Sequence, residues 1–236
     1  MDKKFKSLAD YNIDIHSSKG LGGWRILYKL FLNKLNFDSI IEIGAGPPTF
    51  LSEIKCLRRI AIDGGDRWKK EYNELGIDFF KIDLDKDELP NLGKVDIAVC
   101  SDVFEHLIFP DRTLFYIHKI IKDDGILFSH VPNEFSLWKT FSVMMGKSDS
   151  MYFHKFCEEY NDPHLHRFTK IGFEKFLKKE FKYNLFIGDM KYHFTAKILG
   201  KLRLKVPYMI EGGPTFVSTN DSNKFNLLKK IKLTLN

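Results

Sequence analysis

From residue 39 onward, short runs of β-branched and other apolar residues alternate with segments whose apolar residues recur at helical spacing. Such runs are typical of strands, and helical spacing is typical of amphipathic helices. The runs predict seven strands, at residues 39–43, 58–63, 76–82, 95–100, 125–131, 183–188 and 214–219. Because strands that alternate with helices form βαβ units, we predict an α/β fold with a mostly parallel sheet and helices on both faces.

Helical patterns fill most connections between these strands. They predict helices at residues 48–57, 67–76, 111–125 and 169–181, and Gly125 is expected to stop the third of them. Residues 133–168 break the alternation, because this long segment is rich in Phe, Met and His. We interpret it as a cap inserted after the fifth strand.

The pattern predicts a single domain over residues 1–236. Its parts are an N-terminal helical lid at 1–35, a core at 36–220 with the cap at about 133–168, and a basic amphipathic tail at 221–236. The tail places Phe225, Leu228, Ile231 and Leu235 on one helical face. We expect this face to dock on its own domain or on a second copy in a homodimer.

Charge and cysteine content narrow the setting of the protein. The 236 residues carry a formal net charge of +6, which favours anionic partners at long range. No run is apolar enough for a signal peptide or a transmembrane segment. The three cysteines lie far apart, as is usual in a reducing compartment. We expect a cytoplasmic protein.

The first predicted strand leads into a glycine turn that lacks the usual phosphate donors. Gly44 and Gly46 supply the turn, but Pro47 and Pro48 have no backbone N–H, and Thr49 stands where a dinucleotide site keeps its last glycine. The turn therefore permits the close approach of a nucleoside without holding a pyrophosphate, and a proline can begin the next helix. We predict a phosphate-free adenosine as ligand.

Polar residues follow the next strands at the edge where ligands of parallel sheets bind. Asp63 ends the second strand about 20 residues after the first, a spacing at which its carboxylate reaches a ribose. Asp83 follows the third strand and is placed to accept a hydrogen bond from an adenine amino group. The fourth strand ends at Cys100 to Asp102, and the fifth at His130 to Asn133.

Together, EIGAGPP, Asp63, Asp83 and VDIAVCSDVFEHL resemble the class I S-adenosylmethionine-dependent methyltransferases over about residues 36–220. The resemblance implies a Rossmann-like sheet of seven strands whose last strand is antiparallel, S-adenosylmethionine as cofactor and S-adenosylhomocysteine as product. Pro48 departs from the third glycine that is common in the family. The cofactor-binding residues implied are Glu42, Gly44, Gly46, Asp63, Gly64, Asp83, Leu84, Cys100, Ser101 and His106.

Methyl transfer is an in-line displacement that needs mainly alignment and the exclusion of water. A hydroxyl acceptor also needs a base, for which histidine is the natural choice. His130 and His106 are the catalytic candidates at the expected edge, with a structural or cofactor-orienting role favoured for His106. The histidines of the cap, together with Cys157, match no tight zinc template, so we expect no metal.

The enclosing cap and the positive charge favour a small anionic acceptor. A phosphorylated or nucleotide-linked metabolite, such as a bacterial cell-surface glycan precursor, fits this description. The residues expected to bind it are Lys19, Arg25, Asn133, His166 and Arg167. No nucleic-acid acceptor is expected, because SDVF replaces a DPPY-like motif after the fourth strand. A non-catalytic cofactor-binding or interaction protein, a nicotinamide-dependent enzyme, and an RNA or protein methyltransferase remain the alternatives.

Overall fold

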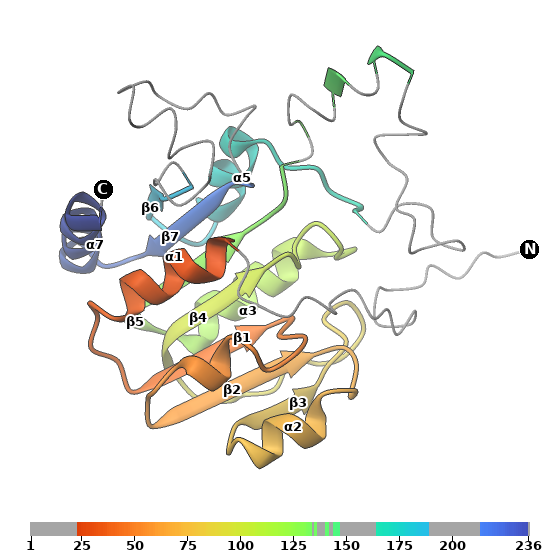
Figure 1. Cartoon of the computed structure of the whole chain (residues 1–236), viewed down its shortest axis with the longest axis vertical. Coiled ribbons are helices and arrows are strands. Elements are labelled where there is room, and N and C mark those ends of the chain that lie inside the picture. Colours follow the sequence, from red (N-terminus) through yellow and green to blue (C-terminus); the bar gives the residue numbers. More distant parts are fainter. Residues whose placement is uncertain are drawn as a thin grey trace, which may run out of the picture.

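One seven-stranded sheet organises the protein in the computed structural model (Figure 1). The structure describes residues 23–133, 135, 140–141, 144–146, 164–188 and 213–235. The strands are β1 (Ser39–Ile43), β2 (Arg58–Asp63), β3 (Asp78–Lys81), β4 (Val95–Ser101), β5 (Ile121–His130), β6 (Tyr183–Phe186) and β7 (Thr215–Thr219). All seven strands predicted from the sequence are therefore present.

The strands follow the order β3-β2-β1-β4-β5-β7-β6 across the sheet. Neighbours from β3 to β5 are parallel, whereas β7 is antiparallel to both β5 and β6. The implied antiparallel last strand is thus confirmed. In the register, Ile43 lies opposite Ile62 on one side and Cys100 on the other. The carboxyl ends of β1, β2 and β4 are therefore level, and the residues that follow them meet at one edge.

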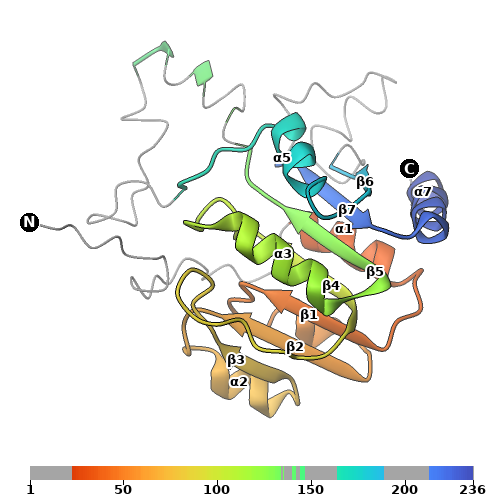
Figure 2. The ribbon, with the colours of Figure 1, turned by 180° about the vertical axis from the view of Figure 1, so that it is seen from behind.

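Helices cover both faces of the sheet, which gives three layers (Figures 1 and 2). On one face lie α1 (Gly23–Leu32), α2 (Lys69–Glu74) and α7 (Ser222–Leu235); on the other lie α3 (Pro110–Ile120) and α5 (Lys170–Leu177). Phe31, Tyr72 and Leu228 belong to the buried core of the first face. Ile117 and Phe173 belong to that of the second. The two apolar cores hold the sheet edge rigidly in place.

The helix predicted at residues 48–57 is wrong. The chain after Pro48 forms turns and one 3-10 helix, Leu51–Glu53, and then becomes extended at Ile54. The guanidinium of Arg59 donates to the carbonyl oxygens of Leu51 and Ile54, at 3.3 and 3.4 Å. In a longer helix, the carbonyl oxygen of Leu51 would accept a hydrogen bond from a later backbone N–H. Here it accepts one from the Arg59 side chain, and this contact stabilises the early end of the helix.

The predicted helix stop at Gly125 is also wrong, because α3 ends at Ile120 and Gly125 lies inside β5. A Cβ atom at Gly125 would lie 2.2 Å from the Cγ2 of Ile121 and 3.0 Å from the carbonyl oxygen of Asp96. Glycine therefore permits the close approach of β5 to β4 at an irregular part of their pairing.

The C-terminal tail is helix α7, and it packs on its own domain. Leu228 and Ile231 are buried, and Phe225 stacks on Tyr183 of β6 with ring centroids 5.1 Å apart. In the ranges given above, no helix has the length and apolar character needed to cross a bilayer. Residues 1–22 of the predicted lid and most of the predicted cap lie outside the described residues.

Candidate active site

The glycine turn after β1 is built as the sequence predicts. Gly44 and Gly46 have φ angles of 68° and 57°, a region that residues with a side chain rarely adopt. A Cβ atom on Gly44 would lie only 2.2 Å from the Cγ2 of Val103. The backbone therefore passes close to the segment after β4, and only glycine fits at this position.

Asp63 ties β2 to this turn. Its Oδ2 accepts a hydrogen bond from the N–H of Gly46, and its Oδ1 accepts one from the N–H of Gly65, each at 2.8 Å. Gly64 lies between Asp63 and Gly65 in the chain. The carboxylate is thus held at the strand end beside the glycine turn, the place where the sequence predicts contact with a ribose.

Asp83 and Leu84 form the next part of the edge. The Oδ1 of Asp83 accepts a hydrogen bond from the N–H of Asp85 at 3.1 Å, and Leu84 is buried. Asp85 in turn accepts from the N–H groups of Ile108 and Phe109, at 2.9 and 3.1 Å. The loop at residues 83–85 is therefore fixed to the segment after β4, and it lies where the sequence predicts the adenine.

Glu42 is a buried carboxyl group beneath the turn, with 2% of its surface exposed. Burial raises the pKa of Glu42 to about 8; Arg25 opposes the shift and Asp63 adds to it. Arg25 is itself only 8% exposed, and its Nε has no hydrogen-bond partner. The guanidinium therefore lies in the interior beside the turn and not on an open surface.

A second polar group joins α1, β4, β5 and β7. The Nε1 of Trp24 donates to the Oδ2 of Asp102 at 3.0 Å, and the Trp24 ring stacks on His130 with centroids 5.9 Å apart. The Nδ1 of His130 lies 2.8 Å from the Oγ1 of Thr215, and its Nε2 lies 3.5 Å from the Oδ1 of Asp102. Asp102 has a φ of 56°, the one positive value among the described residues other than glycine. Such strain is often found at functional sites.

Cys100 and Ser101 end β4 in the interior of this edge. The Oγ of Ser101 lies 3.0 Å from the hydroxyl of Tyr28, with which it shares a hydrogen bond. Burial raises the pKa values of Tyr28 and Cys100 well above their usual range, so both side chains stay protonated and uncharged. The contact fixes α1 over the end of β4.

Four of the five remaining predicted residues lie in the described part of the chain. His106 is buried after β4, and the N–H of His166 donates to the carbonyl oxygen of Glu105 at 3.0 Å, so these two histidines lie near each other. Asn133 and Arg167 are partly buried, and the Oδ1 of Asn133 accepts from the N–H of Phe135. Lys19 lies outside the described residues.

A comparison of the sequence with models of protein families identifies the family. The family model described as a methyltransferase domain matches residues 23–180. The chain belongs to the methyltransferase domain family. The class I resemblance seen in the sequence is confirmed. At the level of sequence, no curated protein shows a significant match.

Solved methyltransferases share the fold at low sequence identity. One from Thermotoga maritima, described as a possible histamine N-methyltransferase, is 16% identical with a TM-score of 0.53; the match covers 84% of this chain and 91% of that one. One from Clostridium acetobutylicum is 14% identical with a TM-score of 0.57, over 84% and 92%. The plantazolicin methyltransferase, solved with a triazolic desmethylplantazolicin analogue and S-adenosylhomocysteine, is 17% identical with a TM-score of 0.57, over 90% of both chains.

Sequence reasoning assigned no role to four residues whose side chains meet at this edge of the sheet: Trp24, Tyr28, Asp102 and Thr215. Asp102 directly follows β4, and its place at a strand end is the one sequence feature that indicates a functional role for any of the four. The hydroxyl of Thr215 reaches His130 only because β7 inserts beside β5. No local pattern in the sequence predicts the contact between Thr215 and His130.

Proposed function

We propose that the protein transfers a methyl group from S-adenosylmethionine to a small anionic metabolite. The observation that carries the proposal is the glycine turn tied to Asp63, which offers a ribose site and lacks the donors that a pyrophosphate needs. Methyltransferases of the same fold have been solved with S-adenosylhomocysteine. In this assignment Asp63 binds the ribose hydroxyls, and Asp83 with Leu84 surrounds the adenine.

Arg25 is the proposed partner of the methionine end of the same cofactor. A buried guanidinium donor without an acceptor is costly, so an anionic group of a ligand would complete it. S-adenosylmethionine brings a carboxylate. Arg25 lies close enough to Glu42 and Tyr72 for its charge to oppose the rise that burial causes in the pKa values of both. We therefore assign Arg25 to the methionine carboxylate of the cofactor, in place of the substrate role expected from the sequence.

His130 is the proposed base for a hydroxyl acceptor. The Thr215 hydroxyl donates to the carbonyl oxygen of Gly213 at 3.0 Å, so its oxygen accepts from the Nδ1–H of His130. The neutral ring then carries its lone pair on Nε2, which faces Asp102. When Nε2 takes the proton of the acceptor, the carboxylate of Asp102 stabilises the imidazolium. The acceptor oxygen attacks the methyl carbon as the bond from that carbon to sulfur breaks.

The acceptor is assigned from charge and enclosure. The formal net charge of +6 favours an anion, and Asn133, His166 and Arg167 stand at the start and end of the predicted cap segment. A phosphorylated or nucleotide-linked metabolite, such as a cell-surface glycan precursor, meets both conditions. Lys19 is a further candidate for its phosphate groups.

Two measurements test this function. Titration calorimetry should show binding of S-adenosylmethionine and S-adenosylhomocysteine by the folded protein, and no binding at millimolar ligand would refute it. Incubation with methyl-labelled cofactor and a metabolite extract should label a small anion, which mass spectrometry identifies. Label found only in RNA, DNA or protein would refute the acceptor class, and no label at all would favour a non-catalytic binding protein.

The base is tested separately with His130→Ala. General bases contribute about 10²- to 10⁴-fold to rate, so we expect kcat to fall by about that factor while cofactor affinity changes little. His118→Ala is the control, because His118 pairs with Glu180 on the surface away from the strand ends. Full turnover by His130→Ala would leave alignment as the main source of rate.

A further inference from the structure

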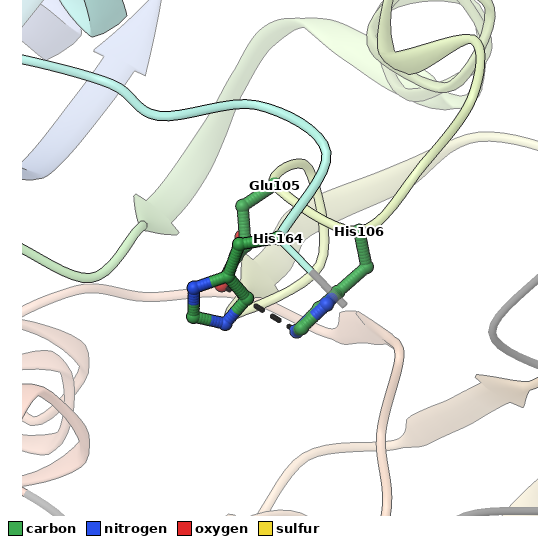
Figure 3. A group of neighbouring side chains, drawn as sticks. All are labelled: Glu105, His106 and His164. Atoms are coloured by element: carbon green, nitrogen blue, oxygen red, sulfur yellow. Dashed lines mark ion pairs between the residues drawn. The ribbon is translucent and has the colours of Figure 1, made fainter. Parts of the chain in front are cut away.

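Two histidines and a glutamate lie close together near the carboxyl end of β4 (Figure 3). Glu105 and His106 follow β4, whereas His164 lies in the segment before α5. One ligand atom from each side chain lies within 4.8 Å of the other two, and this is the one such group that the described ranges contain. Glu105 is 1% exposed and His106 is 7% exposed, whereas His164 is partly buried.

We propose that Glu105, His106 and His164 bind a divalent transition-metal ion. Imidazole nitrogens with a carboxylate oxygen form the donor set that Zn²⁺, Mn²⁺ and Fe²⁺ accept in proteins. Three protein ligands leave coordination positions open for water or a substrate oxygen, as in catalytic metal sites. The prediction of no metal was based on spacings within the cap, whereas this set joins the cap end to the segment after β4.

The separations fit an ion better than a direct contact. The Nε2 of His106 lies 3.8 Å from the Oε1 of Glu105, which is too long for a hydrogen bond. Two atoms that each bind one ion at about 2.1 Å lie up to about 4.2 Å apart, so this pair already has a ligand separation. The rings of His106 and His164 have centroids 4.7 Å apart at an angle of 61°, and a ring nitrogen of His164 lies within 4.8 Å of the other two ligand atoms.

The chemistry of the three side chains suits a divalent ion. Neutral imidazoles use their ring nitrogen lone pairs as metal ligands, and a carboxylate supplies a negatively charged oxygen. Two protonated imidazoles at this ring separation would repel each other, so the pair is better suited to the neutral form that binds a metal.

The ion would also link the end of the cap to the core. If methyl transfer takes place as proposed above, its open positions would lie on the acceptor side of the edge, where a metal lowers the pKa of a bound hydroxyl. This consequence rests on the proposed function, but binding of the ion does not. Metal uptake is therefore measured without cofactor or acceptor.

The test uses the whole protein after removal of metals with a chelator. Titration with Zn²⁺ and with Mn²⁺, followed by dialysis and elemental analysis, should give one bound ion per chain. Co²⁺ should give the visible absorption bands of a coordinated ion. His164→Ala and Glu105→Gln should each weaken binding at least tenfold, whereas His118→Ala, which removes a histidine from another carboxylate pair, should not change it.

His164→Cys tests whether His164→Ala loses Zn²⁺ binding through loss of a ligand or through loss of structure. A thiolate is also a Zn²⁺ ligand, so His164→Cys should restore the binding that His164→Ala loses. Circular dichroism should show that all variants fold. The proposal is overturned if the wild-type protein takes up no ion, or if His164→Ala and Glu105→Gln bind metal as tightly as the wild type. Neither result would affect the calorimetric test of cofactor binding.

Discussion

The Oδ2 of Asp63 accepts a hydrogen bond from the N–H of Gly46 at 2.8 Å, although the two residues belong to the ends of different strands. The parallel register of β1 and β2 brings them together. One carboxylate therefore shapes the glycine turn and, in the proposed function, also binds the ribose hydroxyls. Changes at Asp63 should affect cofactor affinity through both contacts.

Asp63→Asn should weaken S-adenosylmethionine binding at least tenfold. The amide places an NH₂ group where the N–H of Gly46 or Gly65 now donates, so one donor loses its acceptor. Calorimetry measures the effect. Asp66→Asn is the matched control, because Asp66 is exposed and pairs with Lys81. Equal affinities for Asp63→Asn and the wild type would remove Asp63 from the cofactor site.

Arg25→Met should weaken binding of S-adenosylmethionine by about 10- to 100-fold, the range for a lost hydrogen bond to a charged group. Binding of 5′-methylthioadenosine, which lacks the amino-acid part, should change little. Comparing the two ligands by calorimetry separates a carboxylate contact from a general effect on α1. A similar loss for both ligands would show that Arg25 only supports the fold.

Gly44→Ala should lower the free energy of unfolding by about 2 to 4 kcal/mol, since it adds both backbone strain and a clash. The new Cβ would lie 2.2 Å from the Cγ2 of Val103, at a φ of 68°. Gly76→Ala is the control for strain alone, because Gly76 has a φ of 64° and a Cβ added there would meet nothing within 4 Å. It should cost about 1 kcal/mol. Urea denaturation measures both, and Val103→Ala should partly rescue Gly44→Ala.

Glu42 should make stability depend on pH in a particular direction. Its pKa rises from 4.5 to about 8 in the folded protein, chiefly through burial. Between these values the folded state keeps a proton that the unfolded state has released, so the free energy of unfolding falls as pH rises through this window. Glu42→Gln removes this contribution, and its stability should fall less from pH 5 to pH 8 in urea titrations. Identical pH profiles would contradict the shifted pKa.

The sequence predicted the sheet well because each strand is marked locally by a short apolar run and its place between helical patterns. It also predicted the glycine turn at Gly44 and Gly46 and the strand-end position of Asp63, since a turn and its spacing to the next carboxylate are features of the chain itself. Their contacts with a cofactor stay predictions. The helix predicted at residues 48–57 is absent because its carbonyl oxygens at Leu51 and Ile54 accept hydrogen bonds from Arg59, a residue of the next strand. The contacts of Asp102, His130 and Thr215 depend on strand order, which no single segment encodes. The cytoplasmic location and the homodimer stay predictions.

The position of β7 between β5 and β6 has a consequence for biosynthesis. On the ribosome, β6 is made before its partner, and the outer edge of β5 stays open until residue 219 has emerged. The residues matched by the family model end at 180, before either strand, so that stretch alone leaves a bare strand edge and an uncovered apolar face. Residues 215–219 must therefore have emerged before the sheet closes, and translation that stops before them should yield aggregation-prone fragments.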